Sequence, residues 1–283
     1  MTDRTHFRSR FAARLIGALA LAALASGCTV SGGGVAEVDP DTSGASSANI
    51  ASLNDVVKRN PNDPSAYITR GAANARIGRY GDAISDFSAA IKLDPGLVAA
   101  YTNRALAYRQ TGRNDSALND FNQAIQINPR HAPAYLGRAN LLRAQGNLAD
   151  ALADLDNAIK LYPEGAQAFH ARGLIYQKQG QHPQAITDFD NAIDRDPFAA
   201  APYQARGQSL LATGKTDQAI DDFNSALNVN NRNTDAWAGL GIAYERQNNR
   251  TKAVESYTRA LAVNNQNQVA RDGMSRLGAG ALL

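Results

Sequence analysis

The feature that most constrains this chain is a 34-residue unit that recurs six times in phase. Aligned on itself, the sequence gives copies that begin at Pro64, Val98, Ala132, Ala166, Ala200 and Thr234. A fixed period of this length is typical of a solenoid, in which each copy stacks only on its neighbours. Because a single copy cannot bury its own apolar face, the stacking itself stabilises such an array.

The recurring positions predict two helices joined by a tight turn. Small and bulky apolar residues recur three or four places apart, which is the spacing of one helix face. The fifteenth place, where a left-handed residue ends the first helix, is glycine in five copies and Asn248 in the sixth. A proline ends the second helix in four copies, whereas the last two have Asn231 and Asn265. We expect those last two connections to be looser.

An aromatic residue near the start of the first helix also recurs in every copy. The six residues are Tyr67, Tyr101, Tyr135, Phe169, Tyr203 and Trp237. With the small residues and the turn, they resemble the tetratricopeptide repeat family from Pro64 to about Asn267. The resemblance implies an all-α fold, a right-handed superhelical solenoid of six helix-turn-helix repeats. The repeats are 64–97, 98–131, 132–165, 166–199, 200–233 and 234–267.

Both ends of the array are expected to carry a capping half-repeat, because terminal repeats need a polar outer face. Residues 48–63 predict a lone second helix before the first repeat. Residues 268–283 predict a lone first helix and a tail, with Val269, Met274 and Leu277 facing the stack.

Five copies place an arginine and an aspartate on faces that are otherwise apolar. The arginines, at the seventh place, are Arg70, Arg104, Arg138, Arg172 and Arg206, and the aspartates, at the twenty-third, are Asp86, Asp120, Asp154, Asp188 and Asp222. The sixth copy has Leu240 and Ser256 instead. Since both charges are lost together, we expect each arginine to pair with the aspartate of its own hairpin, in a structural role.

The N-terminal segment has the parts of an export signal. Residues 1–27 contain four arginines, an apolar stretch from Leu15 to Ala25, and small residues at its end. With the single cysteine, Cys28, they resemble a bacterial lipoprotein signal, which implies acylation of Cys28 and a lipid anchor. Thr29 implies the periplasm-facing outer membrane by the same resemblance. The alternative is cleavage near Ala25, which gives a soluble periplasmic or secreted protein. Residues 28–47 predict a flexible tether.

The residue pattern does not favour catalysis. After the signal, His131, His170 and His182 occupy different places of the repeat, and neither a phosphate loop nor a metal-ligand spacing is present. Beyond residue 27 the chain holds 25 basic and 25 acidic residues, so its charge does not favour nucleic acid. We expect a protein that is not an enzyme, uses no cofactor or metal, and does not bind nucleic acid.

In the tetratricopeptide family the first helices line a concave groove that binds a peptide or a helix of a partner. Its places here predict an apolar strip beside a basic one. The candidate groove residues are Ile68, Arg76, Leu106, Arg109, Leu136, Asn140, Arg143, Leu174, Lys178, Ile242 and Arg246. The clamp that holds chaperone tails is not matched, because Leu136 stands in place of its lysine.

The resemblance therefore implies a non-catalytic scaffold of the bacterial cell envelope that binds a protein or peptide partner in the periplasm. Two alternatives are a protein that binds cell-wall glycan and a component of a secretion or outer-membrane assembly machinery. The sequence predicts neither the partner's identity nor the oligomeric state.

Overall fold

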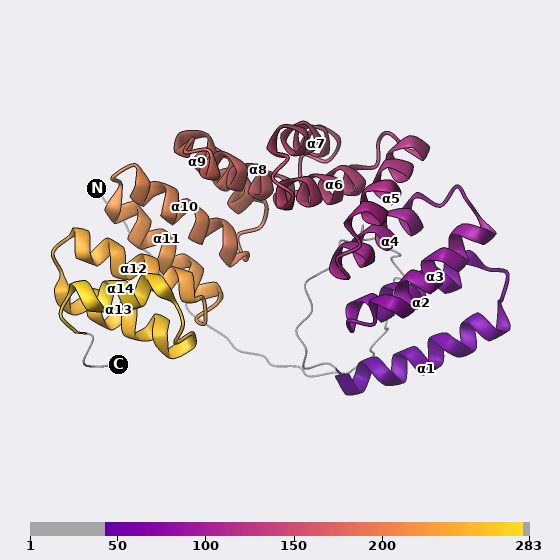
Figure 1. The fold of residues 1–283 in the computed structure, drawn as a ribbon, viewed down its shortest axis with the longest axis horizontal. Helices are drawn as coiled ribbons and strands as arrows, with labels where there is room; N and C mark the ends of the chain where they lie inside the picture. The colour runs from indigo at the N-terminus through magenta and orange to yellow at the C-terminus, as the bar shows by residue number, and fades with distance from the viewer. Residues whose placement is uncertain (1–42, 280–283) are drawn as a thin grey trace, which may run out of the picture. The chain divides into compact units, whose positions relative to one another are not determined.

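The computed structural model describes residues 43–279, with side chains from Ile50 onward. This part of the chain is helical throughout and contains no strand, so the predicted all-α fold is confirmed (Figure 1). The helices are α1 Ser43–Arg59, α2 Pro64–Arg76, α3 Tyr80–Leu93, α4 Val98–Gln110, α5 Asn114–Ile127, α6 Ala132–Ala144, α7 Leu148–Leu161, α8 Ala166–Lys178, α9 His182–Arg195, α10 Ala200–Ala212, α11 Thr216–Val229, α12 Thr234–Arg246, α13 Arg250–Val263 and α14 Gln268–Arg276. None of them is long and apolar enough to cross a bilayer.

Each repeat is a hairpin made of a first helix of 13 residues and a second helix of 14. The first helices, α2, α4, α6, α8, α10 and α12, begin at the same residues as the six copies of the repeat. Between the two helices lies one residue with positive φ, such as Gly180 at 73°, and in the sixth repeat it is Asn248 at 56°. Glycine adopts this left-handed conformation without strain, and asparagine is a tolerated substitute. The predicted turn is confirmed.

Side-chain hydrogen bonds hold the connections between repeats. In five of them an aspartate or asparagine accepts a hydrogen bond from the backbone nitrogen two residues later, at 2.8 to 3.2 Å. The last two connections, which lack proline, keep this bond. They also gain Asn233 and Asn267, whose side chains cap α12 and α14. The expectation that these connections are looser is not supported. In the other connections proline restricts the backbone, and in these two the capping hydrogen bonds take over that role.

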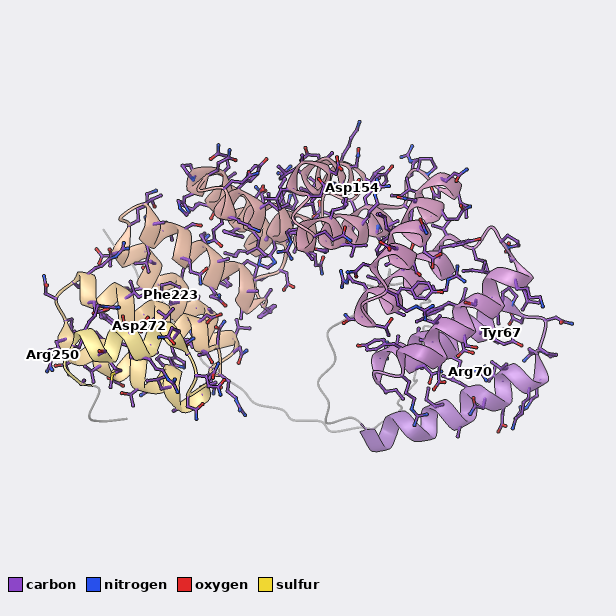
Figure 2. All side chains as sticks on the ribbon, in the orientation of Figure 1. Tyr67, Arg70, Asp154, Phe223, Arg250 and Asp272 are labelled. Atoms are coloured by element: carbon purple, nitrogen blue, oxygen red, sulfur yellow. The ribbon has the colours of Figure 1, made fainter. Side chains whose placement is uncertain are left out.

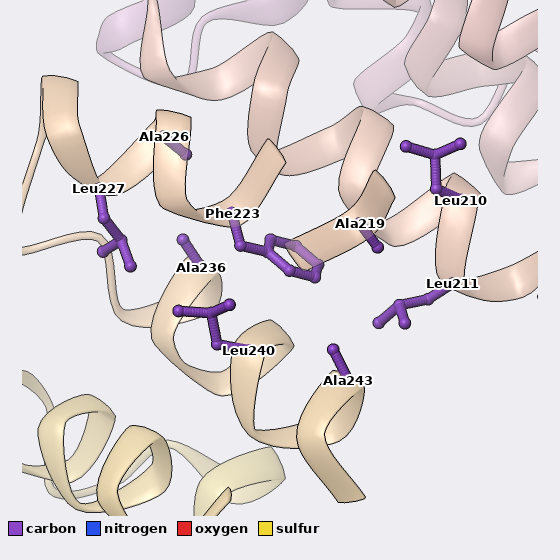
Figure 3. Packing of buried hydrophobic residues seen from close by; sticks show 9 residues of the cluster. All are labelled: Leu210, Leu211, Ala219, Phe223, Ala226, Leu227, Ala236, Leu240 and Ala243. Atoms are coloured by element: carbon purple, nitrogen blue, oxygen red, sulfur yellow. The ribbon is translucent and has the colours of Figure 1, made fainter. Parts of the chain in front are cut away.

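One bulky side chain from each second helix fills each hairpin. These residues are at most 1% exposed and are Phe87, Phe121, Leu155, Phe189, Phe223 and Tyr257. Figure 3 shows Phe223 between small and aliphatic residues of α10, α11 and α12. The opposing helix needs glycine where it crosses the ring: a Cβ on Gly137 would lie 2.3 Å from Cε1 of Phe121. Glycine therefore sets how closely neighbouring hairpins approach.

The first helices form a continuous layer. Each contacts the first helix of the next repeat, from α2 through α14, whereas no two second helices contact one another in residues 43–279. Helices α1 and α14 continue the pattern as half-repeats, α1 against α2 and α14 against α12 and α13. The layer of first helices is therefore the surface on which residues from several repeats come together.

The two capping helices differ from the sequence prediction in detail. Helix α1 begins at Ser43, so the predicted tether of residues 28–47 is wrong for its last five residues. Once a helix has formed, each further residue adds a hydrogen bond, and a composition argument does not capture this extension. In α14, Met274 is fully buried, but Val269 is 44% exposed and Ala270 is buried instead. The predicted export signal and Cys28 lie outside the described residues.

Candidate functional site

The seventh-place arginine of each of the first five repeats pairs with the aspartate of its own hairpin, as predicted. Arg138 Nε and Nη2 donate to the two carboxylate oxygens of Asp154, each at 2.7 Å. The same pair forms in the other four repeats. Each aspartate side chain is at most 10% exposed, so the pairs lie in the hairpin interior. Figure 2 shows Arg70, which also stacks 5.8 Å over the ring of Tyr67.

A third contact of these arginines was not predicted. The free Nη1 of each arginine donates to a residue 16 places earlier, on the second helix of the preceding repeat or on α1. The acceptors are Asn54, Ser88, Asn122, Asp156 and Asp190. We call the arginine with its two acceptors the staple of that repeat. A polar residue recurring at the twenty-fifth place was the signal that could have revealed it. The staple joins successive hairpins, and all three nitrogens of its arginine already donate within the protein.

Charge is segregated between the two layers of helices. The first helices α2, α4, α6, α8 and α10 contain no acidic residue, although they hold nine basic ones. Five of these are the staple arginines. The other four form no ion pair within the described residues, and they are Arg76, Arg109, Arg143 and Lys178. A chain that is neutral beyond residue 27 therefore has four basic residues without an acidic partner on α2, α4, α6 and α8.

Six of the predicted groove residues are half-buried on α4, α6 and α8, and each of these first helices contacts the next. Leu106 is three residues from Arg109, and on α6 Leu136, Asn140 and Arg143 are spaced by four and three, so each set shares a face. All five are half-buried, as is Leu174, which adds a further apolar residue from α8. We call these six residues the central surface.

The other predicted groove residues are not part of the central surface. Ile68 and Ile242 are half-buried, but they lie on α2 and α12, which are not in contact with each other. Arg76 and Lys178 are exposed. Arg246 donates through Nη1 to the carbonyl oxygen of Leu211 on α10, so this arginine joins two repeats.

The centre of the surface carries uncompensated positive charge. Burial and the nearby charge of Arg143 lower the pKa of Arg109. The same two causes lower the pKa of His170, on α8, to about 4. Arg143 Nε is buried and has no hydrogen-bond partner in the described part of the chain. Sequence reasoning missed His170, because it sought only apolar residues at the fifth place of the repeat.

Two other features carry no chemistry of their own. Within residues 43–279, no group of three histidine, cysteine or acidic side chains could hold a metal ion. A cavity of about 300 Å³ between α1, α2 and α3 is lined by Arg70, Asn74 and Asp86 among others. It therefore belongs to the first staple.

These features define a solenoid of helical hairpins with a mixed apolar and basic first-helix layer. Tetratricopeptide repeat profiles match residues 98–131 and 166–198, 139–180, 50–98 and 205–268, and 121–153. The chain belongs to the tetratricopeptide repeat family, whose members typically act as non-catalytic scaffolds for protein or peptide partners. A comparison with curated proteins finds no sequence match.

Solved structures share the fold. The chain is similar to a structure titled as the APC/C hetero-tetramer Cut9-Hcn1, with a TM-score of 0.73 and 20% identity over 83% of this chain and 46% of that one. It is similar to PilW, described as a type IV pilus biogenesis factor (TM-score 0.66, 21% identity, 74% and 97% covered). It is also similar to YrrB, described as having an unusual peptide-binding site (TM-score 0.56, 21% identity, 67% and 97% covered).

Proposed function

We propose that this chain is a non-catalytic scaffold that binds a segment of a partner protein on its first-helix layer. The observation that carries the proposal is the central surface, where half-buried leucines lie beside an asparagine and two arginines. Each staple arginine pairs with an aspartate and with a second acceptor of the chain, whereas Arg109 and Arg143 form no ion pair within residues 43–279. We infer that another molecule supplies their partner.

The fold supports this role by its geometry. A continuous layer of first helices presents residues from several repeats to one extended ligand, which a compact domain of the same size cannot do. Apolar side chains that alternate with a few polar groups are a recurring arrangement for peptide recognition. The peptide-binding site named for YrrB and the pilus biogenesis role named for PilW agree with such a role, by analogy of fold.

We further propose that the scaffold works in the bacterial cell envelope, exported by residues 1–27 and anchored through Cys28. Incorporation of labelled palmitate in cells tests the anchor. The wild-type chain should take up the label and Cys28→Ser should not. A mature N-terminus at Ser26 without an acyl chain would instead establish cleavage near Ala25.

Site-specific photo-crosslinking in living cells tests the binding role. A photoreactive amino acid replaces Asn140 on α6 in one variant, and in the control it replaces Asn157, which is exposed on the second helix of the same repeat. We expect discrete protein crosslinks from position 140 and few from position 157. Equal yields from both positions, or crosslinks to wall polysaccharide alone, would contradict a protein-binding first-helix layer.

A further inference from the structure

The arginines of the first helices form two groups, one with acidic partners within the protein and one without. At the seventh place, each guanidinium has an aspartate from its own hairpin and a second acceptor from the element before it. At the twelfth place, Arg109 and Arg143 have no acidic partner in residues 43–279, although both are half-buried. The structural arginines are therefore neutralised internally, and this pair is not.

The twelfth place points toward the next first helix. In the fourth repeat that place is Gln177, whose side-chain nitrogen donates to the carbonyl of Ala205 at 2.8 Å and to Ser209 Oγ at 2.9 Å, both on α10. Ser209 stands at the tenth place of its repeat. Next to Arg109, the tenth place of α6 is Leu141, and next to Arg143, the tenth place of α8 is Ile175. Both are buried aliphatic residues, so the side-chain acceptor that Ser209 gives to Gln177 is missing next to Arg109 and Arg143.

The two arginines also lie close enough to repel. The charge of Arg143 acts on Arg109 from one side and on His170 from the other. Two half-buried like charges without a counter-ion destabilise the free protein. An anion bound beside the two guanidinium groups removes that repulsion.

We infer that Arg109 and Arg143 together bind one carboxylate, from an Asp or Glu side chain in an extended segment of a partner protein. This inference rests on the proposed function and specifies its ligand. A guanidinium group matches the planar, two-oxygen geometry of a carboxylate. Leu106, Leu136 and Leu174 receive aliphatic neighbours of that acid, and Asn140 hydrogen-bonds the segment's backbone.

The position of the pair in the array selects an internal acid over a chain terminus. Arg109 and Arg143 belong to the second and third of six repeats, so first helices continue on both sides of them. Apolar residues lie beside the pair and beyond it, with Leu106 next to Arg109 on α4 and Leu174 on α8. A segment bound here therefore extends in both directions from its acid.

Selection from random displayed peptides tests the inference. The purified chain is screened against a library of internal peptides and against a second library with free C-termini. The variants are Arg109→Met, Arg143→Met and the double substitution, and the control is Arg76→Met, which removes an unpaired charge from α2. We expect the wild-type chain and Arg76→Met to select internal peptides with Asp or Glu beside aliphatic residues. The best such peptide should bind each single variant about tenfold more weakly, or worse, and the double variant weaker still.

Each other result has a defined meaning. Selected peptides without acid enrichment would overturn the carboxylate inference and leave the proposed function standing, whereas an absence of any selected peptide would count against the proposed function itself. Acids enriched only at free C-termini would overturn the internal segment. A single-stranded oligonucleotide that competes as well as the peptide would show that the surface binds any anionic polymer. That result would also overturn the inference.

Thermal unfolding separates binding from folding. Because Arg143 is an uncompensated charge in the free protein, Arg143→Met should unfold at the same temperature as the wild type or higher, while its peptide affinity falls. A lower midpoint together with lost binding would indicate a structural arginine and would overturn the inference.

Discussion

The sixth repeat joins its neighbours differently from the first five. Those five use a buried staple, whereas the sixth has Leu240, which is 2% exposed and packs in the same cluster as Phe223. Its link to the C-terminal helix is made by Glu245, which accepts a hydrogen bond from Tyr257 and forms a 2.7 Å ion pair with Arg276 on α14. Both arrangements stack hairpins in the same fold. Stacking therefore requires close packing between successive hairpins. A staple provides it in the first five repeats, and an apolar side chain provides it in the sixth.

The largest expected effect comes from removing one charge of a staple. Asp154→Ala leaves the partly buried Arg138 guanidinium without its anion, which should lower the free energy of unfolding by about 3 kcal/mol. The double variant Arg138→Leu with Asp154→Ser copies the sixth repeat and should cost less than the single substitution. Urea denaturation of the three proteins gives the comparison. A double variant that is less stable than Asp154→Ala would show that leucine cannot replace the staple.

Acid should destabilise the folded chain through His170. Its pKa is lowered to about 4 in the folded chain, against 6.5 for an ordinary histidine, so the unfolded chain binds more protons between these values. Stability should therefore fall as the pH drops from 6.5 to 4, by an amount on the order of 3 kcal/mol for this residue. Unfolding free energies of the wild type and of His170→Gln across this range measure the effect. A pH slope that is unchanged in His170→Gln would exclude His170 as its source.

The link to the C-terminal helix should depend on one hydroxyl group. Tyr257→Phe gives the sixth repeat the ring found in four of the others and removes the hydrogen bond to Glu245. A hydrogen bond to a charged group contributes about 2 kcal/mol. Tyr203→Phe is the matched control, since no hydrogen bond of that hydroxyl is found in the described chain. Equal losses of stability in the two variants would mean that the hydroxyl of Tyr257 contributes nothing specific.

The smallest expected effect concerns the turn of the hairpin. Gly180 has a φ of 73°, where an alanine costs about 1 kcal/mol and an asparagine less. Gly180→Asn copies Asn248 of the sixth repeat and should lie between the wild type and Gly180→Ala in urea denaturation. If the two substitutions cost the same, local hydrogen bonding by asparagine does not help the left-handed conformation here.

The elements that repeat were predictable from the sequence, because each was sampled six times. The hairpin turns and the pairing of Arg138 with Asp154 follow from positions that recur in phase. The joint loss of both charges at Leu240 and Ser256 assigned each arginine to its own hairpin. That information lies in the comparison between copies and needs no knowledge of the packing.

Features that depend on contacts between copies were missed. The Nη1 bond from Arg138 to Asn122 crosses into the preceding repeat, and the charge of Arg143 acts on Arg109 of α4 and on His170 of α8. The ends were also predicted less well. Val269 follows the apolar spacing but stands at the second place of a first helix, which is exposed in all six repeats, whereas Ala270 stands at the buried third place.

Nuclear magnetic resonance of leucine methyl groups tests the central claim, that a partner segment binds on the first-helix layer. The chain is titrated with the acidic peptide selected from the internal library. The account predicts shifts at Leu106, Leu136 and Leu174, with Leu118 and Leu152 on the second helices unchanged. Shifts confined to Leu118 and Leu152 would contradict it, because the ligand would then lie on the opposite layer.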